Sequence, residues 1–343
     1  MNVRGWQLAL ALILLMASTA VACGDSPKTN EVVLYTSMPD SVVDRLQGVI
    51  EQRFPDLDGN VWMASDESIS LRVVRGRTAD MQQLIEDEIA NGGVEADLIW
   101  LAEPSPYETY KERGLLAPYV PSPEAPIPSS YVDPDGFYVA GRIIAMVVAW
   151  NTSLLPEGLA DWSDLHEVGT AAFPAPQSGA ARATIKGLID EFGQEFFARF
   201  AEGGGLSVAS NGAARDGVAD GSLDAVAVLD YMARQAKANG SEVDFVYPAS
   251  GTVLIPSPIA ITAAASNPSD ARAVVDFILS QPGQNILVQI GSFYSVRTDV
   301  APPAGAPPLH TITSLDIDWN ALSSEIDDIS AFWGELFESG ASA

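Results

Sequence analysis

Four loops of the sequence carry hydroxyl, amide or guanidinium groups among small residues, and each loop stands directly ahead of a predicted helix. The candidate ligand-binding residues in these loops are Thr36 and Ser37; Arg77 and Thr78; Ser178, Gly179 and Ala180; and Asn211. Helix N-termini present backbone N–H groups to anions, and small residues allow a ligand close to the backbone. Serine and threonine also cap helices, so capping alone explains any one loop. The four loops together, from both halves of the chain, predict an anionic or oxygen-rich ligand.

Two further positions could contact such a ligand. Arg142 precedes a strongly apolar run, where its guanidinium could point into a cleft and bind a carboxylate or phosphate with two hydrogen bonds. The alternative for Arg142 is a structural salt bridge. Asp230 and Tyr231 end an apolar segment, so the carboxylate could bind an ammonium or hydroxyl group. The alternative for this pair is a helix cap beside a packed aromatic ring.

The sequence lacks a recognisable catalytic arrangement. The two histidines, His166 and His310, are far apart and have no partner at the spacing of a metal site or a catalytic triad. The glycines at 203–205 do not lie between a strand and a helix, as a dinucleotide-binding loop requires. We therefore expect no catalytic residues, no cofactor and no resident metal. A secreted hydrolase is kept as a remote alternative.

The elements that must position these residues alternate between strands and helices. Apolar segments at 32–35, 69–74 and 97–101 predict strands, and the spacing of apolar residues after the first two predicts helices, the first starting near Ser41. A long strand is predicted at 141–150, a second α/β region at 171–231, and two short strands at 252–256 and 259–261. Residues 315–337 predict a pair of amphipathic helices. This order is typical of an α/β fold whose mostly parallel sheets are covered by helices.

The N-terminal sequence and the net charge indicate the cellular location of the protein and the partners that it can bind. Arg4, an apolar run and a series of small residues precede Cys23, the only cysteine. This arrangement resembles a bacterial lipoprotein signal, which implies that Cys23 becomes the lipidated N-terminus, although Ala20 stands where such signals most often have leucine. The chain has 45 acidic and 18 basic residues, which disfavours binding to nucleic acid or to anionic lipid headgroups. A mature length of about 320 residues predicts two lobes.

The chain resembles the bacterial extracellular solute-binding family that includes ferric-ion, phosphonate and sugar-phosphate receptors. The stretches that carry the resemblance are residues 33–37, 74–78, 96–101, 135–138, 149–152, 177–181, 246–248, 251–253, 277–280 and 283–284. The resemblance implies a type II periplasmic-binding-protein fold, in which two α/β lobes are joined by crossing strands and close on a ligand. It also implies a monomer that is exported, is anchored to the membrane through Cys23, and delivers its solute to a permease powered by an ATPase.

The resemblance also implies residue limits for each part of the chain and a set of cleft residues. The limits are 1–22 for the signal, 23–30 for a tether, 31–138 with 256–302 for the first lobe, and 139–255 with 303–343 for the second. The loop residues given above, with Asp230 and Tyr231, would line the cleft. No catalytic role is expected for any of them.

The sequence departs from the ferric-ion receptors, which present adjacent tyrosines and often a histidine after the first strand. Met38 follows Ser37 here, and only Tyr231, with Asp230 beside it, could stand for the tyrosine pair. We therefore predict a small organic anion as the solute, a phosphonate or phosphate ester, with ferric iron as the alternative. A polyamine or thiamine is a further alternative, suggested by the acidic composition and by Asp230.

Overall fold

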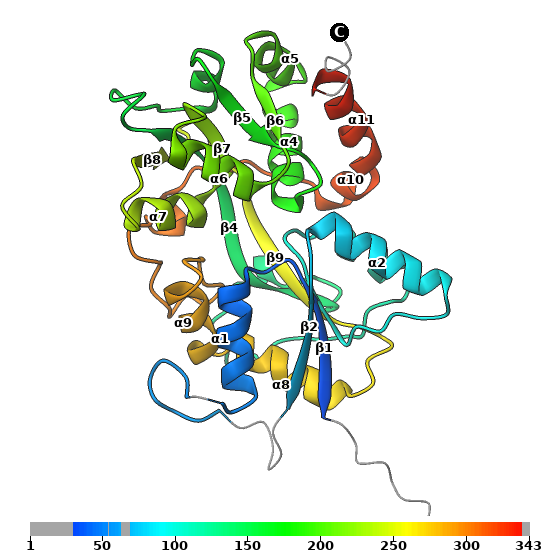
Figure 1. Cartoon of the computed structure of the whole chain (residues 1–343). Helices are drawn as coiled ribbons and strands as arrows, with labels where there is room; N and C mark the ends of the chain where they lie inside the picture. The colour runs from blue at the N-terminus through cyan, green and yellow to red at the C-terminus, as the bar shows by residue number, and fades with distance from the viewer. Residues whose placement is uncertain (1–29, 54, 63–68, 338–343) are drawn as a thin grey trace, which may run out of the picture.

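The computed structural model describes residues 30–53, 55–62 and 69–337, which form two α/β lobes (Figure 1). Hydrogen-bonded strands run through both lobes in the order β2-β1-β3-β9-β4-β7-β5-β6, and β8 also pairs with β4. The predicted fold class is confirmed. The predicted signal and Cys23 lie outside the described residues, as does most of the predicted tether. The residue limits of the lobes stay a prediction.

The first lobe is built on the N-terminal strands. Its strands are β1 (Glu31–Thr36), β2 (Ser70–Arg75), β3 (Leu98–Trp100), β9 (Leu254–Ile261) and the first part of β4 (Tyr138–Asn151). β1 is parallel to β2 and to β3, whereas β9 is antiparallel to β3 and to β4. Its helices are α1 (Asp40–Ile50), α2 (Thr78–Ala90), α3 (Ser105–Glu112), α8 (Pro268–Leu279) and α9 (Gln281–Gln289). A 3-10 helix, η1 (Ser129–Tyr131), lies in the connection before β4.

The second lobe follows β4. Its other strands are β5 (Ala171–Pro174), β6 (Leu206–Val208), β7 (Ala225–Leu229) and β8 (Val243–Val246). β5 is parallel to β6 and to β7, and β4 is antiparallel to β7 and to β8. Its helices are α4 (Gly179–Phe192), α5 (Glu195–Glu202), α6 (Asn211–Asp220), α7 (Asp230–Ala238), α10 (Trp319–Ser324) and α11 (Ile326–Phe337), with the 3-10 helices η2 (Trp162–His166) and η3 (Leu309–Thr311).

β4 belongs to both lobes. Its residues up to Ala145 pair with β9, and those from Met146 onward pair with β7 and then also with β8. Every residue from Val139 to Asn151 is buried, which explains why the segment reads as a continuous apolar run. A bulge at Gly141 shifts the register just before Arg142. A Cβ atom at Gly141 would lie 2.8 Å from the ring of Trp100, so the close approach requires glycine.

The predicted strands and helices lie close to those observed, with one difference. The two strands predicted at 252–256 and 259–261 are one strand, β9, because Pro256 and Pro258 do not interrupt it. β3 pairs only with Ile259–Ile261, so the stretch that contains the prolines has β4 on one side and no described strand on the other. Proline lacks the N–H that a second neighbour would need, and it is therefore tolerated on such an edge.

Candidate functional site

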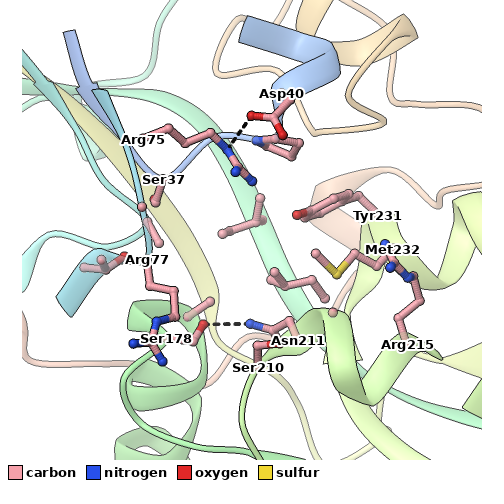
Figure 2. A pocket seen from close by; sticks show the side chains of 18 of the residues that line it. Ser37, Asp40, Arg75, Arg77, Ser178, Ser210, Asn211, Arg215, Tyr231 and Met232 are labelled. Atoms are coloured by element: carbon pink, nitrogen blue, oxygen red, sulfur yellow. Dashed lines mark hydrogen bonds and ion pairs between the residues drawn. The ribbon is translucent and has the colours of Figure 1, made fainter. Parts of the chain in front are cut away.

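A cavity of about 700 Å³ lies between the two lobes, and the beginnings of five helices line it (Figure 2). α1 and α2 contribute Asp40 and Thr78 from the first lobe. α4, α6 and α7 contribute Ala180, Asn211 and Tyr231 from the second lobe. The N-termini of helices carry partial positive charge, so this arrangement favours an anion between the lobes.

The strand order explains why these helix starts meet. β1 and β2 are parallel, and each is followed by a loop and a helix, so α1 and α2 begin at the same edge of the first sheet. β5, β6 and β7 lead in the same way into α4, α6 and α7 in the second lobe. Ligands of open α/β sheets bind outside the carboxyl ends of the strands, which is where this cavity lies.

Four arginines and two aspartates line the cavity, so its formal charge is +2 in a chain whose net charge is −27. Three of the arginines form ion pairs with exposed carboxylates. Arg75 pairs with Asp40 at 3.1 Å, as Figure 2 shows. Arg77 pairs with Asp80 at 2.9 Å, and Arg215 pairs with Asp216 at 2.7 Å. Exposed pairs of this kind are worth about 0–1 kcal/mol, so a bound anion can replace the carboxylates at small cost.

Arg142 differs from these three arginines because it is buried and forms no ion pair with any residue that the structure describes. Its side chain lines the cavity and the residue is only 3% exposed. The Nε atom donates to the hydroxyl of Ser257 at 3.2 Å, and the guanidinium lies 4.2 Å from the ring centre of Phe293. Among the described residues, the Nη1 atom has no hydrogen-bond partner. Burial lowers the pKa of Arg142 to about 10, so the guanidinium remains charged at neutral pH.

Two other buried polar atoms of the cavity lining lack partners among the described residues. They are the hydroxyl oxygen of Ser37, in the first lobe, and the amide oxygen of Asn211, in the second lobe. The amide nitrogen of Asn211 donates to the hydroxyl of Ser178 at 2.7 Å, which fixes how the amide points (Figure 2). Buried polar groups are almost always hydrogen-bonded. Each lobe therefore contributes to the cavity lining one buried polar atom that is available for a further hydrogen bond.

Tyr231 contributes a buried phenol to the same cavity. Burial raises the pKa of its hydroxyl, and the nearby positive charge of Arg142 opposes part of that rise. The hydroxyl is therefore neutral at physiological pH. In that form it can donate a hydrogen bond to an oxygen atom of a ligand.

Eight of the eleven residues predicted to bind the ligand line the cavity: Ser37, Arg77, Thr78, Arg142, Ser178, Ala180, Asn211 and Tyr231. Thr36 does not, because its buried hydroxyl donates to the carbonyl of Trp100 and accepts from the N–H of Met38. It stabilises the loop before α1 instead.

Gly179 and Asp230 are also missing from the lining. A Cβ atom at Gly179 would lie 2.9 Å from Cγ of Glu103, so this glycine allows contact with the first lobe. The carboxylate of Asp230 accepts hydrogen bonds from Arg234, Tyr247 and the N–H of Ala145. An ion pair within α7 thus takes the place of the predicted contact with an ammonium or hydroxyl group.

The sequence reasoning missed four charged residues of the lining, Asp40, Arg75, Asp80 and Arg215. Arg75 ends β2, two residues before the predicted Arg77. It could have been predicted, because it is a second arginine in the same short segment before α2. Arg215 follows Asn211 by four residues, so one turn of α6 places both side chains on the same face. Asp40 is the first residue of α1, directly after the predicted loop.

The described residues contain no group of three histidine, cysteine or acidic side chains that could hold a metal ion. In the same part of the chain, no helix is both long and apolar enough to cross a membrane.

A cavity between two lobes, lined by helix starts and crossed at its base by a shared strand, defines a binding protein that encloses a small solute. A family model described as bacterial extracellular solute-binding protein matches residues 95–325, which is more than half of the chain. The chain belongs to this family. It is therefore the exported solute-binding component of an ABC-type importer, and not an enzyme.

Several solved structures share the fold of this chain. AfuA from Actinobacillus pleuropneumoniae, solved with fructose-6-phosphate, is 21% identical over 90% of this chain and 98% of its own, with a TM-score of 0.77. Iron-bound HitA from Pseudomonas aeruginosa is 19% identical over 89% of this chain and 99% of its own, with a TM-score of 0.73. A periplasmic thiamin binding protein is 15% identical over 89% and 96% of the two chains, with a TM-score of 0.72. At these identities the similarity shows the fold alone. Curated protein sequences contain no match to the chain.

Proposed function

We propose that the protein binds a small organic anion with two negative charges, a phosphonate or phosphate ester, in the cavity between its lobes. The observation that carries the proposal is the Nη1 atom of Arg142, which has no hydrogen-bond partner in the described part of the chain. A buried charge costs free energy unless it is paired, so the cavity is incomplete without an anion at this arginine.

The surrounding groups support a phosphoryl group in particular. Its several oxygen atoms match the several donors around the cavity: the Arg142 guanidinium, the phenol of Tyr231 and the hydroxyl of Ser37. The formal charge of +2 on the lining matches a dianion. Arg75, Arg77 and Arg215 would exchange their exposed aspartate partners for the solute as the lobes close.

Ferric iron is the alternative within the same fold, which iron-bound HitA also has. Hard Fe³⁺ prefers oxygen ligands with negative charge. Burial raises the pKa of Tyr231, the tyrosine of the cavity lining, and both oxygens of Asp230 are engaged elsewhere. These two features argue against iron. A thiamine or polyamine cation would have to lie beside the unpaired charge of Arg142, which argues against those solutes as well.

Isothermal titration calorimetry tests the proposal with phenyl phosphate, phenylphosphonate, a sugar phosphate, inorganic phosphate, ferric citrate, thiamine and spermidine. We expect one of the first three to bind most tightly. Replacement of Arg142 by methionine should weaken this binding by roughly 30-fold or more, since loss of a buried charged partner costs at least about 2 kcal/mol.

The matched control is Arg113→Met. Arg113 is exposed, pairs with Glu86 and does not line the cavity, so this variant should keep the affinity of the wild type. Tight binding of iron alone, lost in Tyr231→Phe, would overturn the proposal in favour of the ferric receptor.

We further propose that the mature chain begins at a lipidated Cys23 and acts as a monomer. The support for the lipid anchor is the sequence before Cys23, which resembles a lipoprotein signal. Mass spectrometry of the membrane-extracted protein should give an N-terminal peptide that starts at Cys23 and carries acyl chains. A peptide with a free thiol, or with a different start, would contradict the lipid anchor.

A further inference from the structure

The loop of residues 291–294, between α9 and the C-terminal segment, lies directly against β4 beside Arg142. The backbone of Tyr294 exchanges two hydrogen bonds with Ile143, at 3.0 Å and 3.2 Å. The N–H of Phe293 donates to the carbonyl of Leu287 in α9, at 3.2 Å. The loop is thus fixed on both sides, next to the arginine that we assign to the solute.

Within this loop, Phe293 contacts two buried side chains of the cavity lining, the charged Arg142 and the neutral Tyr231. Its ring centre lies 4.2 Å from the guanidinium of Arg142. The ring also meets the ring of Tyr231 edge-on, at 4.7 Å between centres and 77° between planes. Phe293 is 1% exposed and does not itself line the cavity. Its contact with a ligand would therefore be indirect, through Arg142 and Tyr231.

The backbone before Phe293 has an uncommon conformation. Ser292 has a φ angle of 56°, in the left-handed region that residues other than glycine rarely adopt. Arg234 of α7 donates to the carbonyl of Ser292 at 2.5 Å and pairs with Asp230 at 2.8 Å. Strained backbone persists only where its surroundings hold it, and here an ion pair from the second lobe does so.

The choice of an aromatic ring beside Arg142 has an electrostatic consequence. A carboxylate in this position would orient the guanidinium but would also neutralise it and compete with an anionic solute. The face of an aromatic ring attracts a cation without carrying a net charge. Arg142 makes one described hydrogen bond, from Nε to Ser257, and the ring supplies the second constraint on its orientation.

We infer that Phe293 is a positioning residue, which holds the guanidinium of Arg142 in the orientation that receives the anionic group of the solute and leaves its charge available. The inference rests on the proposed function. The turn at Ser292 and its bond to Arg234 keep the ring in place.

A double-mutant cycle tests whether Phe293 acts through Arg142. Phe293→Leu, Arg142→Met and the double variant are titrated calorimetrically with the tightest-binding phosphate or phosphonate of the panel. We expect Phe293→Leu to weaken binding at least tenfold in the wild type and less than twofold in the Arg142→Met background. Coupling of this kind is the signature of two residues that act as a unit.

The control separates positioning from general packing. Phe200→Leu removes a ring that is also 1% exposed but lies in the core of the second lobe, away from the cavity. It should lower the melting temperature and leave the affinity unchanged. If Phe293→Leu does not fold, Phe293→Met removes the ring and leaves a flexible apolar side chain that can fill the irregular space.

Two results would overturn the inference, and they are distinguishable. Equal weakening by Phe293→Leu in both backgrounds would show that the ring does not act through Arg142, while the proposed function would stand. Absence of binding of every phosphate and phosphonate to the wild type would remove the proposed function, and the positioning role with it.

Discussion

Arg142 is stabilised by two neighbours that carry no net charge, the hydroxyl of Ser257 and the ring of Phe293. The other arginines of the cavity pair with exposed aspartates, which a solute can displace. At the level of single residues, the site therefore combines one buried arginine, Arg142, with three more exposed arginines whose aspartate partners can be displaced. This division suits a solute whose anionic group enters first and deepest.

The charge of a phosphate ester provides a pH test of this arrangement. A phosphate monoester loses its second proton with a pKa of about 6. Burial lowers the pKa of Arg142 only to about 10, and burial raises the pKa of Tyr231, so neither group titrates between pH 5 and pH 8. The affinity for phenyl phosphate should thus rise about tenfold from pH 5 to pH 7 and then level off.

Calorimetry at pH 5, 6, 7 and 8 measures this dependence, and benzenesulfonate is the control because its single charge is constant over the range. A flat profile for phenyl phosphate, or weaker binding at higher pH, would contradict recognition of a dianion. Neither histidine is among the residues that line the cavity.

The site could be predicted from the sequence only in part. The apolar residues after Arg142 suggested a guanidinium that points into a cleft, and Arg142 does line the cavity, but the sequence could not reveal that it forms no ion pair with a described residue. Asp230 was also predicted from its position at the end of an apolar segment, but its carboxylate forms an ion pair with Arg234, four residues later on α7. The spacing of Asp230 and Arg234 could have been read from the sequence as a pair on one helix face. The surroundings of Arg142 could not, because Ser257 and Phe293 come from distant segments that meet only in the folded chain.

At the scale of elements, the start of α4 forms a contact between the lobes. Arg182 of α4 pairs with Glu103 of the first lobe at 2.6 Å, and both side chains are at least 97% buried. A Cβ atom at Gly179 would lie 2.9 Å from Glu103 and 3.1 Å from Thr78. The small residues of this loop were expected to admit a ligand. At Gly179 the missing side chain instead allows close contact with Glu103 and Thr78 of the first lobe.

We therefore expect Gly179→Ala to separate the lobes. The added methyl group would overpack the contact, at a cost of about 1–3 kcal/mol. The affinity for the solute should fall by roughly fivefold or more, because 1.4 kcal/mol corresponds to a tenfold change. Small-angle X-ray scattering should give a larger radius of gyration for the variant than for the wild type.

Gly92→Ala is the control for this variant. It strains an exposed turn with a φ angle of 117°, but no atom lies within 4 Å of the added Cβ. Its scattering curve should match that of the wild type. An unchanged radius of gyration and affinity for Gly179→Ala would mean that the contact between Gly179 and Glu103 does not control the approach of the lobes.

The elements themselves were largely predictable because their apolar patterns are strong. β4 was recognised by its unbroken apolar run, and α1 by the spacing of its buried residues. β9 was divided into two strands because proline normally ends a strand. The prolines are tolerated because that edge of β9 has no described partner, and pairing of this kind is a property of the assembled sheet.

At the scale of the whole molecule, a cavity with a formal charge of +2 lies within a chain with a net charge of −27. An approaching dianion is therefore repelled by the surface at long range and attracted by the arginines only near the cavity. Salt screens the two effects differently. The Debye length falls from about 30 Å at 0.01 M to about 8 Å at 0.15 M. Added salt therefore screens the long-range repulsion by the acidic surface more strongly than the short-range attraction by the arginines of the cavity.

The association rate constant for the anionic solute should therefore increase with ionic strength over this range, opposite to the usual result for oppositely charged partners. The dissociation rate constant should also increase, because salt weakens the exposed contacts with Arg75, Arg77 and Arg215. Stopped-flow fluorescence at several salt concentrations measures both constants. In Arg142→Met the increase in the association rate should be at least as steep, because the local attraction is smaller. A decrease in the wild-type association rate with salt would mean that the arginines of the cavity, and not the acidic surface, control the approach of the solute.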